Sequence, residues 1–339
     1  MNYAPIIIPT LNRYEHLKAC VESLAACTHA DKTELIIGLD YPPLEKYVEG
    51  WKKVKEYVKN INGFRKVTIL ERSENYGAAK NSITLREYAF QYYDTCIYTE
   101  DDNVFSPCFL DYINKGLEKY KNDEKAIIVS GYFRYEKLGI KIKDCNVFKN
   151  YNDFCAWGYG TWKHKYEKFR NTIKPNYRKI VLNHNLNVLR NFYHYFVFHN
   201  LVYCLDNSAL DRPCDVTYAA SNLIHRTYQI VPSVPMVRNM GYDGSGENCG
   251  TLNDDIHSKR IISDQKFFDF NDKKINRYTR LINRKVSSLR NKELMIGRRA
   301  VLRFYLYLFV CVFVGFDFAE KIRHMGIRRV IKRIFKYWS

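Results

Sequence analysis

The sequence predicts an α/β protein with a mostly parallel sheet that helices cover on both faces. Two observations predict it: short runs rich in β-branched residues, and longer segments between them whose apolar residues recur at helical spacing. Strands that alternate with helices are joined by crossovers, which favours parallel pairing and burial of both sheet faces. With 46% hydrophobic residues among 339, the chain has enough apolar side chains for such a core.

The individual elements are recognised by how each apolar run ends. The first strand is closed by Pro9 and Thr10, the second ends at Asp40 before a proline pair, and a turn over residues 72–77 follows the third. We expect strands at residues 4–8, 35–39, 67–70, 96–99 and 126–130, and amphipathic helices at residues 17–24, 44–58, 78–93 and 109–120.

Three adjacent acids, Glu100, Asp101 and Asp102, end the fourth predicted strand, and Ser106-Pro107 follows as a helix-start signal. Clustered carboxylates repel one another and need a counter-charge when they lie at a buried strand end. Oxygen ligands of this kind suit Mg2+ or Mn2+, which substrate phosphates often share. The pattern therefore favours a metal site over the alternative, a solvated acidic turn.

Polar residues follow several of the predicted strands. Thr10, Asp40, the loop 72–77 and the acids 100–102 all come at the carboxyl end of a strand. Ligands of parallel α/β sheets bind outside these ends. We therefore expect these residues to form a single site.

After residue 150 the chain becomes aromatic and glycine-rich. Residues 152–162 include Trp157 and Gly158, and such a segment suits stacking on a sugar ring or a base; a packed loop with core tryptophans is the alternative. The spacing of a second glycine-rich loop, residues 241–248, fits neither a P-loop nor a dinucleotide fingerprint. Such a loop could instead lie over a bound ligand. Residues 256–295 are polar and basic and are expected to form a linker.

The net charge of +18 predicts an anionic partner, either a phosphorylated substrate, an anionic lipid or a nucleic acid. The ten cysteines show no CxxC pair or zinc-like spacing, so we expect a reducing compartment. The N-terminus lacks the basic and apolar regions of a signal peptide, and export by that route is not expected.

The charge is concentrated in the C-terminal tail, residues 296–339. Its apolar run, residues 304–316, is shorter than the roughly 20 residues that span a bilayer. Beyond it, apolar residues lie on one helical face and basic residues on the rest, which is typical of a helix that lies on an anionic membrane. A basic helix docked on its own domain is the alternative. Because the charge lies at this end, no nucleic-acid partner is expected.

Three segments of the chain resemble the nucleotide-binding half of family-2 glycosyltransferases: residues 6–13 (IIIPTLNR), Asp40 and residues 75–81 (NYGAAKN). Residues 100–102 are similar to the Glu-Asp-Asp metal motif of N-acetylglucosaminyltransferase I and of related bacterial sugar transferases. The resemblance covers roughly residues 3–250 and implies the GT-A fold.

The resemblance also implies roles for particular residues. Asp102 would ligate Mn2+ or Mg2+, and Asp215 would be the catalytic base, with Asp211 as the fallback because Cys214 replaces the usual aromatic residue. Asp40 would accept a hydrogen bond from the base of the nucleotide. The other nucleotide-sugar-binding residues would be Pro9, Thr10, Arg13, Asn75, Gly77, Lys80, Glu100 and Asp101, and the donor and acceptor loops would include Trp157, Gly158, Gly241, Asp243 and Gly244.

Together these features predict a metal-dependent inverting glycosyltransferase. It would move a sugar from a nucleotide-sugar, with UDP as the default, to a hydroxyl of a glycan or lipid-linked acceptor in bacterial surface-polysaccharide synthesis. It would be cytoplasmic and peripheral on the inner face of the plasma membrane. A sugar-1-phosphate nucleotidyltransferase shares the sheet but needs a glycine-rich loop after the first strand. A non-catalytic lipid- or nucleic-acid-binding protein is the other alternative.

The predicted organisation is a glycosyltransferase domain, a linker and a tail. The domain, residues 1–255, would have a nucleotide-binding half over residues 1–130 and an acceptor and catalytic half over residues 131–255. The linker would follow over residues 256–295. Basic amphipathic helices that associate with the membrane would then cover residues 296–339.

Overall fold

The computed structural model describes residues 3–135, 138–152, 154–172, 218, 221–222, 225–246, 251, 257–293, 310 and 313. The chain forms two compact units. The first comprises Met1–Asn150, Phe154–Phe169 and Tyr228–Thr279, and the second comprises Tyr151–Asp153, Arg170–Thr227 and Arg280–Ser339. The elements that build the candidate site all belong to the first unit.

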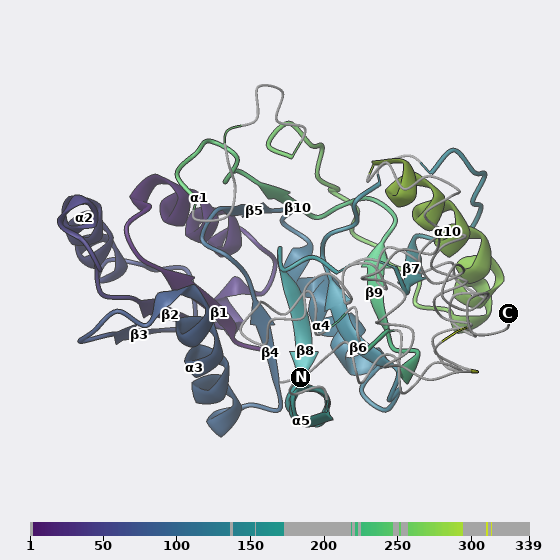
Figure 1. Ribbon diagram of the computed structural model, residues 1–339, viewed down its shortest axis with the longest axis horizontal. Coiled ribbons are helices and arrows are strands. Elements are labelled where there is room, and N and C mark those ends of the chain that lie inside the picture. Colours follow the sequence, from purple (N-terminus) through teal and green to yellow (C-terminus); the bar gives the residue numbers. More distant parts are fainter. Residues whose placement is uncertain are drawn as a thin grey trace, which may run out of the picture. The chain divides into compact units, whose positions relative to one another are not determined.

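A mostly parallel sheet forms the centre of the first unit (Figure 1). Among the described residues its strand order is β3-β2-β1-β4-β8-β6-β9-β7. The strands β8 and β7 pair antiparallel with their neighbours, and the other pairings are parallel. The predicted α/β fold is thus confirmed. The strands are β1 Ile6–Thr10, β2 Glu34–Leu39, β3 Lys66–Glu71, β4 Thr95–Tyr98, β6 Ala126–Ser130, β7 Val147–Asn150, β8 Tyr159–Trp162 and β9 Tyr228–Pro232.

Helices cover both faces of this sheet. Arg86 of α3 donates a hydrogen bond to the Tyr159 hydroxyl of β8 at 2.9 Å, whereas a Cβ on the next residue, Gly160, would lie 2.6 Å from Ile113 of α4. Because successive strand residues point to opposite faces, α3 and α4 lie on opposite sides. The described helices are α1 Tyr14–Ala25, α2 Val48–Val58, α3 Gly77–Tyr92, α4 Phe109–Lys119, α5 Lys163–Thr172 and α10 Asp272–Glu293, with short 3-10 turns at Ala30–Lys32 and Glu45–Tyr47.

The central strands owe their place to their apolar residues. Ile6, Ile7 and Ile8 of β1 are all fully buried, so successive side chains on both faces are shielded from water. Burial of such a side chain stabilises the fold by roughly 1.5–3 kcal/mol. The edge strand β3, in contrast, is only half-buried. This burial explains why β1 reads as a continuous apolar run rather than as an alternating one.

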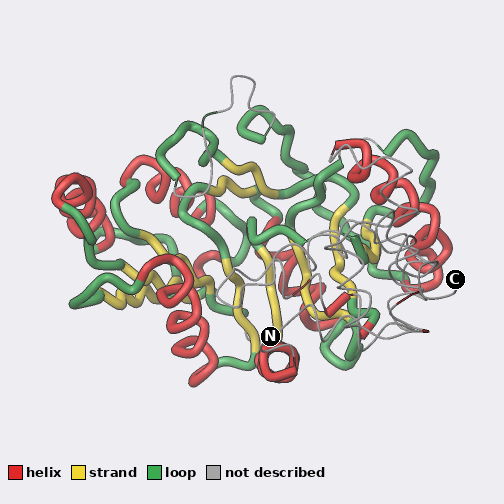
Figure 2. The backbone as a smooth tube through the Cα atoms, viewed as in Figure 1, coloured by secondary structure: helices red, strands yellow, loops and turns green. Residues whose placement is uncertain are grey.

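A second, two-stranded sheet pairs β5 Asn103–Phe105 with β10 Val237–Asn239 in antiparallel fashion. Figure 2 shows this short ribbon among loops beyond the ends of the main strands. The sequence predicted a helix shortly after the acids, but β5 comes first. Ser106 then accepts a hydrogen bond from the Cys108 backbone at 3.2 Å, and α4 begins at Phe109.

The predicted linker over residues 256–295 needs correction for the residues that the structure describes. Arg260 is buried and donates to the backbone carbonyls of Phe133 and Arg134 at 3.0 and 2.8 Å. Helix α10 occupies the second half of the segment, and its Ile275 is fully buried. Within the second unit, Asn283 of the same helix accepts a hydrogen bond from the Tyr151 amide at 2.7 Å. These contacts make the segment part of the packed structure.

Among the residues that can be described, no helix combines the length and the apolar character that a bilayer crossing requires. The tail, residues 296–339, lies outside the described residues except for residues 310 and 313. Its predicted association with a membrane therefore stays a prediction.

Candidate active site

The candidate site lies where three parallel strands end. β1 ends at Thr10, β2 stops one residue before Asp40, and β4 stops shortly before Asp101 and Asp102. The Thr10 hydroxyl donates to Asp101 at 2.8 Å, and the Asp40 amide donates to the Thr10 carbonyl at 2.9 Å. The carboxyl-edge rule thus places these residues together, as the sequence predicted.

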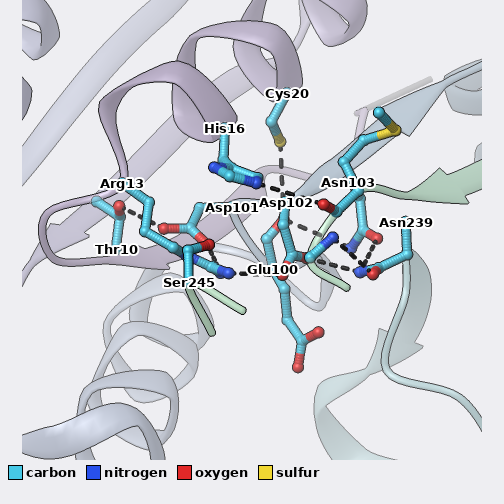
Figure 3. A network of polar contacts seen from close by, with 12 residues as sticks. Thr10, Arg13, His16, Cys20, Glu100, Asp101, Asp102, Asn103, Asn239 and Ser245 are labelled. Carbon is cyan, nitrogen blue, oxygen red and sulfur yellow. Dashed lines mark hydrogen bonds and ion pairs between the residues drawn. The ribbon is translucent and has the colours of Figure 1, made fainter. Parts of the chain in front are cut away.

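Arg13 joins the two buried aspartates (Figure 3). It occupies the N-cap position of α1, so its side chain starts at the same sheet edge. Its guanidinium contacts an oxygen of Asp101 and lies 2.9 Å from Asp102 Oδ2. Burial alone would lower the pKa of Arg13, but the two carboxylates outweigh burial, and the pKa lies above its ordinary value. Arg13 is therefore a fixed positive charge between the two acids.

Asp102 is held from its other side by the small sheet. Asn239 of β10 donates one amide hydrogen to Asp102 Oδ1 at 2.7 Å and another to Asn103 Oδ1 at 3.0 Å. Burial is the main cause that raises the pKa of Asp102, and neighbouring Asp101 adds to it while Arg13 opposes it. Two carboxylates face one guanidinium here, so the cluster retains negative charge when both are ionised.

The loop after β10 closes against this cluster. The Met240 amide donates to the Asp102 carbonyl at 2.8 Å. A Cβ on Gly241 would overlap Asp102 Oδ2 and lie 2.9 Å from Asp102 Cγ, so only glycine fits there without displacement. His16 of α1 lies 3.1 Å from Asp243 Oδ2 and 3.4 Å from the Met240 carbonyl oxygen, which ties the loop to α1.

Further along the loop, ring contacts and backbone geometry fix its course. The Tyr242 ring stacks on His257 at 4.7 Å between centroids, and Trp157 meets both rings edge-on. Gly158 and Gly244 have positive φ angles of 72° and 85°, which favour glycine. Trp157 therefore packs against the loop that follows β10. This contact is compatible with a ring that stacks on a ligand and with a tryptophan that only packs the loop.

Asp40, which the resemblance assigns to the base of the nucleotide, accepts hydrogen bonds from the protein itself. Its Oδ1 accepts from the Tyr41 and Tyr76 amides at 2.9 and 2.8 Å, and its Oδ2 accepts from the Gly77 amide at 2.8 Å and from Asn75 at 3.4 Å. These bonds nearly use the acceptor capacity of a carboxylate. Asp40 thus fixes the turn that starts α3, where Gly77 has φ 70°.

The remaining predicted residues lie at the periphery or outside the described chain. The Lys80 ammonium is exposed, 3.7 Å from the Tyr76 ring centroid and 3.4 Å from Glu74. Pro9 is a half-buried residue of β1. Figure 3 shows the Glu100 carboxylate pointing away from those of Asp101 and Asp102. Asp215 and the fallback Asp211 lie outside the described residues.

His16, Asn103 and Asn239 were not predicted as site residues. His16 follows Arg13 by three residues, so both emerge on one side of the first turn of α1, and this spacing was a usable signal. The two asparagines gain their role from the pairing of β5 with β10, for which the local sequence holds no signal.

The site suits a cation that a substrate helps to hold. In the described part of the chain, no group of three or more His, Cys, Asp or Glu side chains is placed to bind a metal by itself. Asp102 Oδ1 accepts one hydrogen bond, from Asn239, and Oδ2 is ion-paired with Arg13, so neither oxygen has used its full acceptor capacity. Mg2+ in enzymes is commonly held by one or two carboxylates together with substrate phosphates. Asp102 and the excess negative charge fit that arrangement.

The family described as Glycosyl transferase family 2 matches residues 6–191, more than half of the 339 residues. No curated protein matches the chain.

Among solved structures, Staphylococcus aureus TarS is similar at 14% identity over 38% of this chain and 21% of that one, with a TM-score of 0.27. A structure of TarS 1-349 is similar at 12% identity over 47% of both chains, with a TM-score of 0.31. The mannosyltransferase PcManGT from Pyrobaculum calidifontis, in complex with GDP-Man and Mn2+, is similar at 13% identity over 65% of this chain and 69% of that one, with a TM-score of 0.36.

The chain spans less than half of the TarS chains that it matches. The sheet and its flanking helices are GT-A like, as the resemblance implied. With more than half of its residues matched, the chain belongs to glycosyl transferase family 2.

Proposed function

We propose that this protein is a metal-dependent inverting glycosyltransferase that takes a sugar from a nucleotide-sugar and gives it to a hydroxyl group. One observation carries the proposal beyond family membership. Asp101 and Asp102 lie buried at the carboxyl edge of the sheet, held by Arg13 and Asn239 beneath a glycine-rich loop. Such a negatively charged edge suits a cation shared with a diphosphate.

Asp102 would hold Mn2+ or Mg2+, which supplies positive charge against the departing diphosphate. Arg13 and Lys80 would place further positive charge beside the phosphates, because guanidinium and ammonium groups pair well with phosphate oxygens. Thr10 orients Asp101 by donating a hydrogen bond to it, and Asp101 would then accept a hydrogen bond from a hydroxyl of the ribose or of the donor sugar.

Asp40 supports the nucleotide site through the backbone in this proposal. It fixes the turn of Asn75 and Gly77, which would border the ribose and the diphosphate. The loop with Gly241, Asp243 and Gly244, packed on Trp157, would cover the donor. The nucleotide would be UDP, as the resemblance to family-2 glycosyltransferases implies.

The acceptor hydroxyl is a poor nucleophile and must lose its proton while its oxygen attacks the anomeric carbon. Asp215, with Asp211 as the fallback, would accept that proton. The bond from the anomeric carbon to the diphosphate oxygen breaks in the same step, and the nucleoside diphosphate leaves. A single displacement inverts the anomeric configuration.

The acceptor would be a glycan or a lipid-linked glycan of bacterial surface-polysaccharide synthesis. The basic tail, residues 296–339, would keep the enzyme on the anionic inner face of the plasma membrane. Vesicles with and without anionic lipid test this part directly, because only the anionic ones should retain the protein.

The test of the chemistry is nucleoside diphosphate release from a panel of nucleotide-sugars with Mn2+, followed by product analysis. We expect one donor to be consumed and the product to have the opposite anomeric configuration. Asp215→Asn should abolish transfer while metal-dependent donor binding persists. Transfer that survives in this variant contradicts the assignment of the base, and a retained anomeric configuration contradicts direct displacement.

A further inference from the structure

Arg13 already occupies the carboxylates that the proposed function assigns to a cation and a donor. Its guanidinium contacts Asp101 with one nitrogen and lies 2.9 Å from Asp102 Oδ2 with the other. The carboxylates are almost fully buried, with side chains 6% and 8% exposed. A guanidinium keeps its charge at every accessible pH, so it cannot give way by losing a proton.

Every carboxylate oxygen of the pair faces either a hydrogen-bond donor or the Arg13 guanidinium. Asp101 Oδ2 accepts from Thr10 at 2.8 Å, and Asp102 Oδ1 accepts from Asn239 at 2.7 Å. Arg13 takes one remaining oxygen of each aspartate. A divalent cation on Asp102 would therefore lie beside a fixed positive charge at close range, and the two would repel each other.

We propose that Arg13 competes with the divalent cation for Asp102, and that the cation's arrival turns Arg13 toward the donor's diphosphate. This inference rests on the proposed function. Arginine pairs with phosphate in the same two-pronged manner as with carboxylate, so the diphosphate is a suitable new partner. The cation would thus prepare the site for the donor, and by thermodynamic linkage the donor would raise the affinity for the cation equally.

The proposal predicts that the wild-type protein binds Mn2+ alone weakly and binds it much more tightly with a nucleoside diphosphate. Removing Arg13 should relieve the competition. Arg13→Gln alone also makes the cluster more negative, which attracts any cation. The sharper variant is the double substitution Arg13→Gln and Asp101→Asn, because it removes one positive and one negative charge and leaves the charge of the cluster unchanged.

The experiment is calorimetric titration with Mn2+, first alone and then with UDP present. The double variant should bind Mn2+ alone roughly tenfold or more tightly than wild type, since the ion pair between Arg13 and Asp102 no longer competes. The gain in Mn2+ affinity on adding UDP should shrink by a similar factor. Arg65→Gln is the control: Arg65 is exposed, bonds to the Tyr93 hydroxyl, and lies at the opposite edge of the sheet.

The outcomes separate the inference from the proposed function. If wild type binds UDP only with Mn2+ but the double variant binds Mn2+ no more tightly, competition by Arg13 is wrong and the function stands. If wild type binds UDP neither with nor without Mn2+, both the inference and the proposed use of UDP are wrong. Thermal unfolding shows whether each variant is folded. Arg13→Gln leaves two buried carboxylates without their counter-charge, whereas the double variant leaves only one, so the double variant should fold more readily.

Discussion

Gly241→Ala tests how closely the loop after β10 approaches Asp102. The added Cβ would overlap Asp102 Oδ2 and lie 2.9 Å from Cγ, so the loop or the carboxylate must move. Moving the carboxylate breaks a hydrogen bond to a charged group, which costs about 1.5–3 kcal/mol, and overpacking alone costs about 1–3 kcal/mol. Since one displacement relieves both, we expect a loss of about 2–3 kcal/mol in the free energy of unfolding.

The assay pairs chemical denaturation with calorimetric binding of a nucleotide-sugar and Mn2+. Gly116→Ala is the matched control, because its Cβ would lie 2.6 Å from Val129 in the packing of α4 on β6, away from the carboxylates. Both variants should lose stability, but only Gly241→Ala should lose metal-dependent binding. Equal and unchanged binding in the two variants would refute a role for this close approach.

Two further predictions concern buried polar groups. Asn239→Leu removes the donor to Asp102 Oδ1 and should lower the free energy of unfolding by about 1.5–3 kcal/mol, which denaturant titration measures; an unchanged midpoint contradicts this. Burial lowers the pKa of Lys165 to about 8 from 10.5, although its ammonium donates to three backbone carbonyls and lies over the Trp162 ring. Between pH 8 and 10.5 the unfolded chain binds more protons at Lys165 than the folded chain does. The free energy of unfolding of wild type should therefore rise with pH relative to that of Lys165→Met. A difference between the two proteins that stays flat or falls with pH contradicts the shift.

The sheet and the convergence of its ends could be predicted because their causes are local. A parallel strand that is buried on both faces reads as an unbroken apolar run, as in β1 and β2. Once the strands alternate with helices, the carboxyl-edge rule brings Thr10, Asp40 and Asp101 together without further information.

The parts that could not be predicted depend on distant partners. β5 and β10 are three residues long, and their pairing joins segments more than 130 residues apart. Asn239 reaches Asp102 only through that pairing. Helix α10 was missed for a different reason. Its buried Ile275, Ile282 and Val286 recur at helical spacing, but the many polar and basic residues between them led to the expectation of a linker.

For Asp40 the sequence predicted the position in the fold but not the groups that its carboxylate contacts. The sequence placed it at the end of a strand beside a turn, and the structure does the same. Its carboxylate, however, faces the Tyr76 and Gly77 amides at the start of α3. Backbone donors satisfy a buried acid as well as a ligand does, and the amino-acid pattern does not distinguish them.

The role of Asp102 as the residue that holds the cation is tested by calorimetric binding of a nucleotide-sugar panel, with and without Mn2+, to wild type and to Asp102→Ala. Asp31→Asn, an exposed acid before β2, is the control for the loss of one negative charge. We expect one donor to bind only with Mn2+, and we expect Asp102→Ala to lose this binding while Asp31→Asn keeps it. Full metal-dependent binding in Asp102→Ala would contradict the claim that this carboxylate holds the cation for the donor.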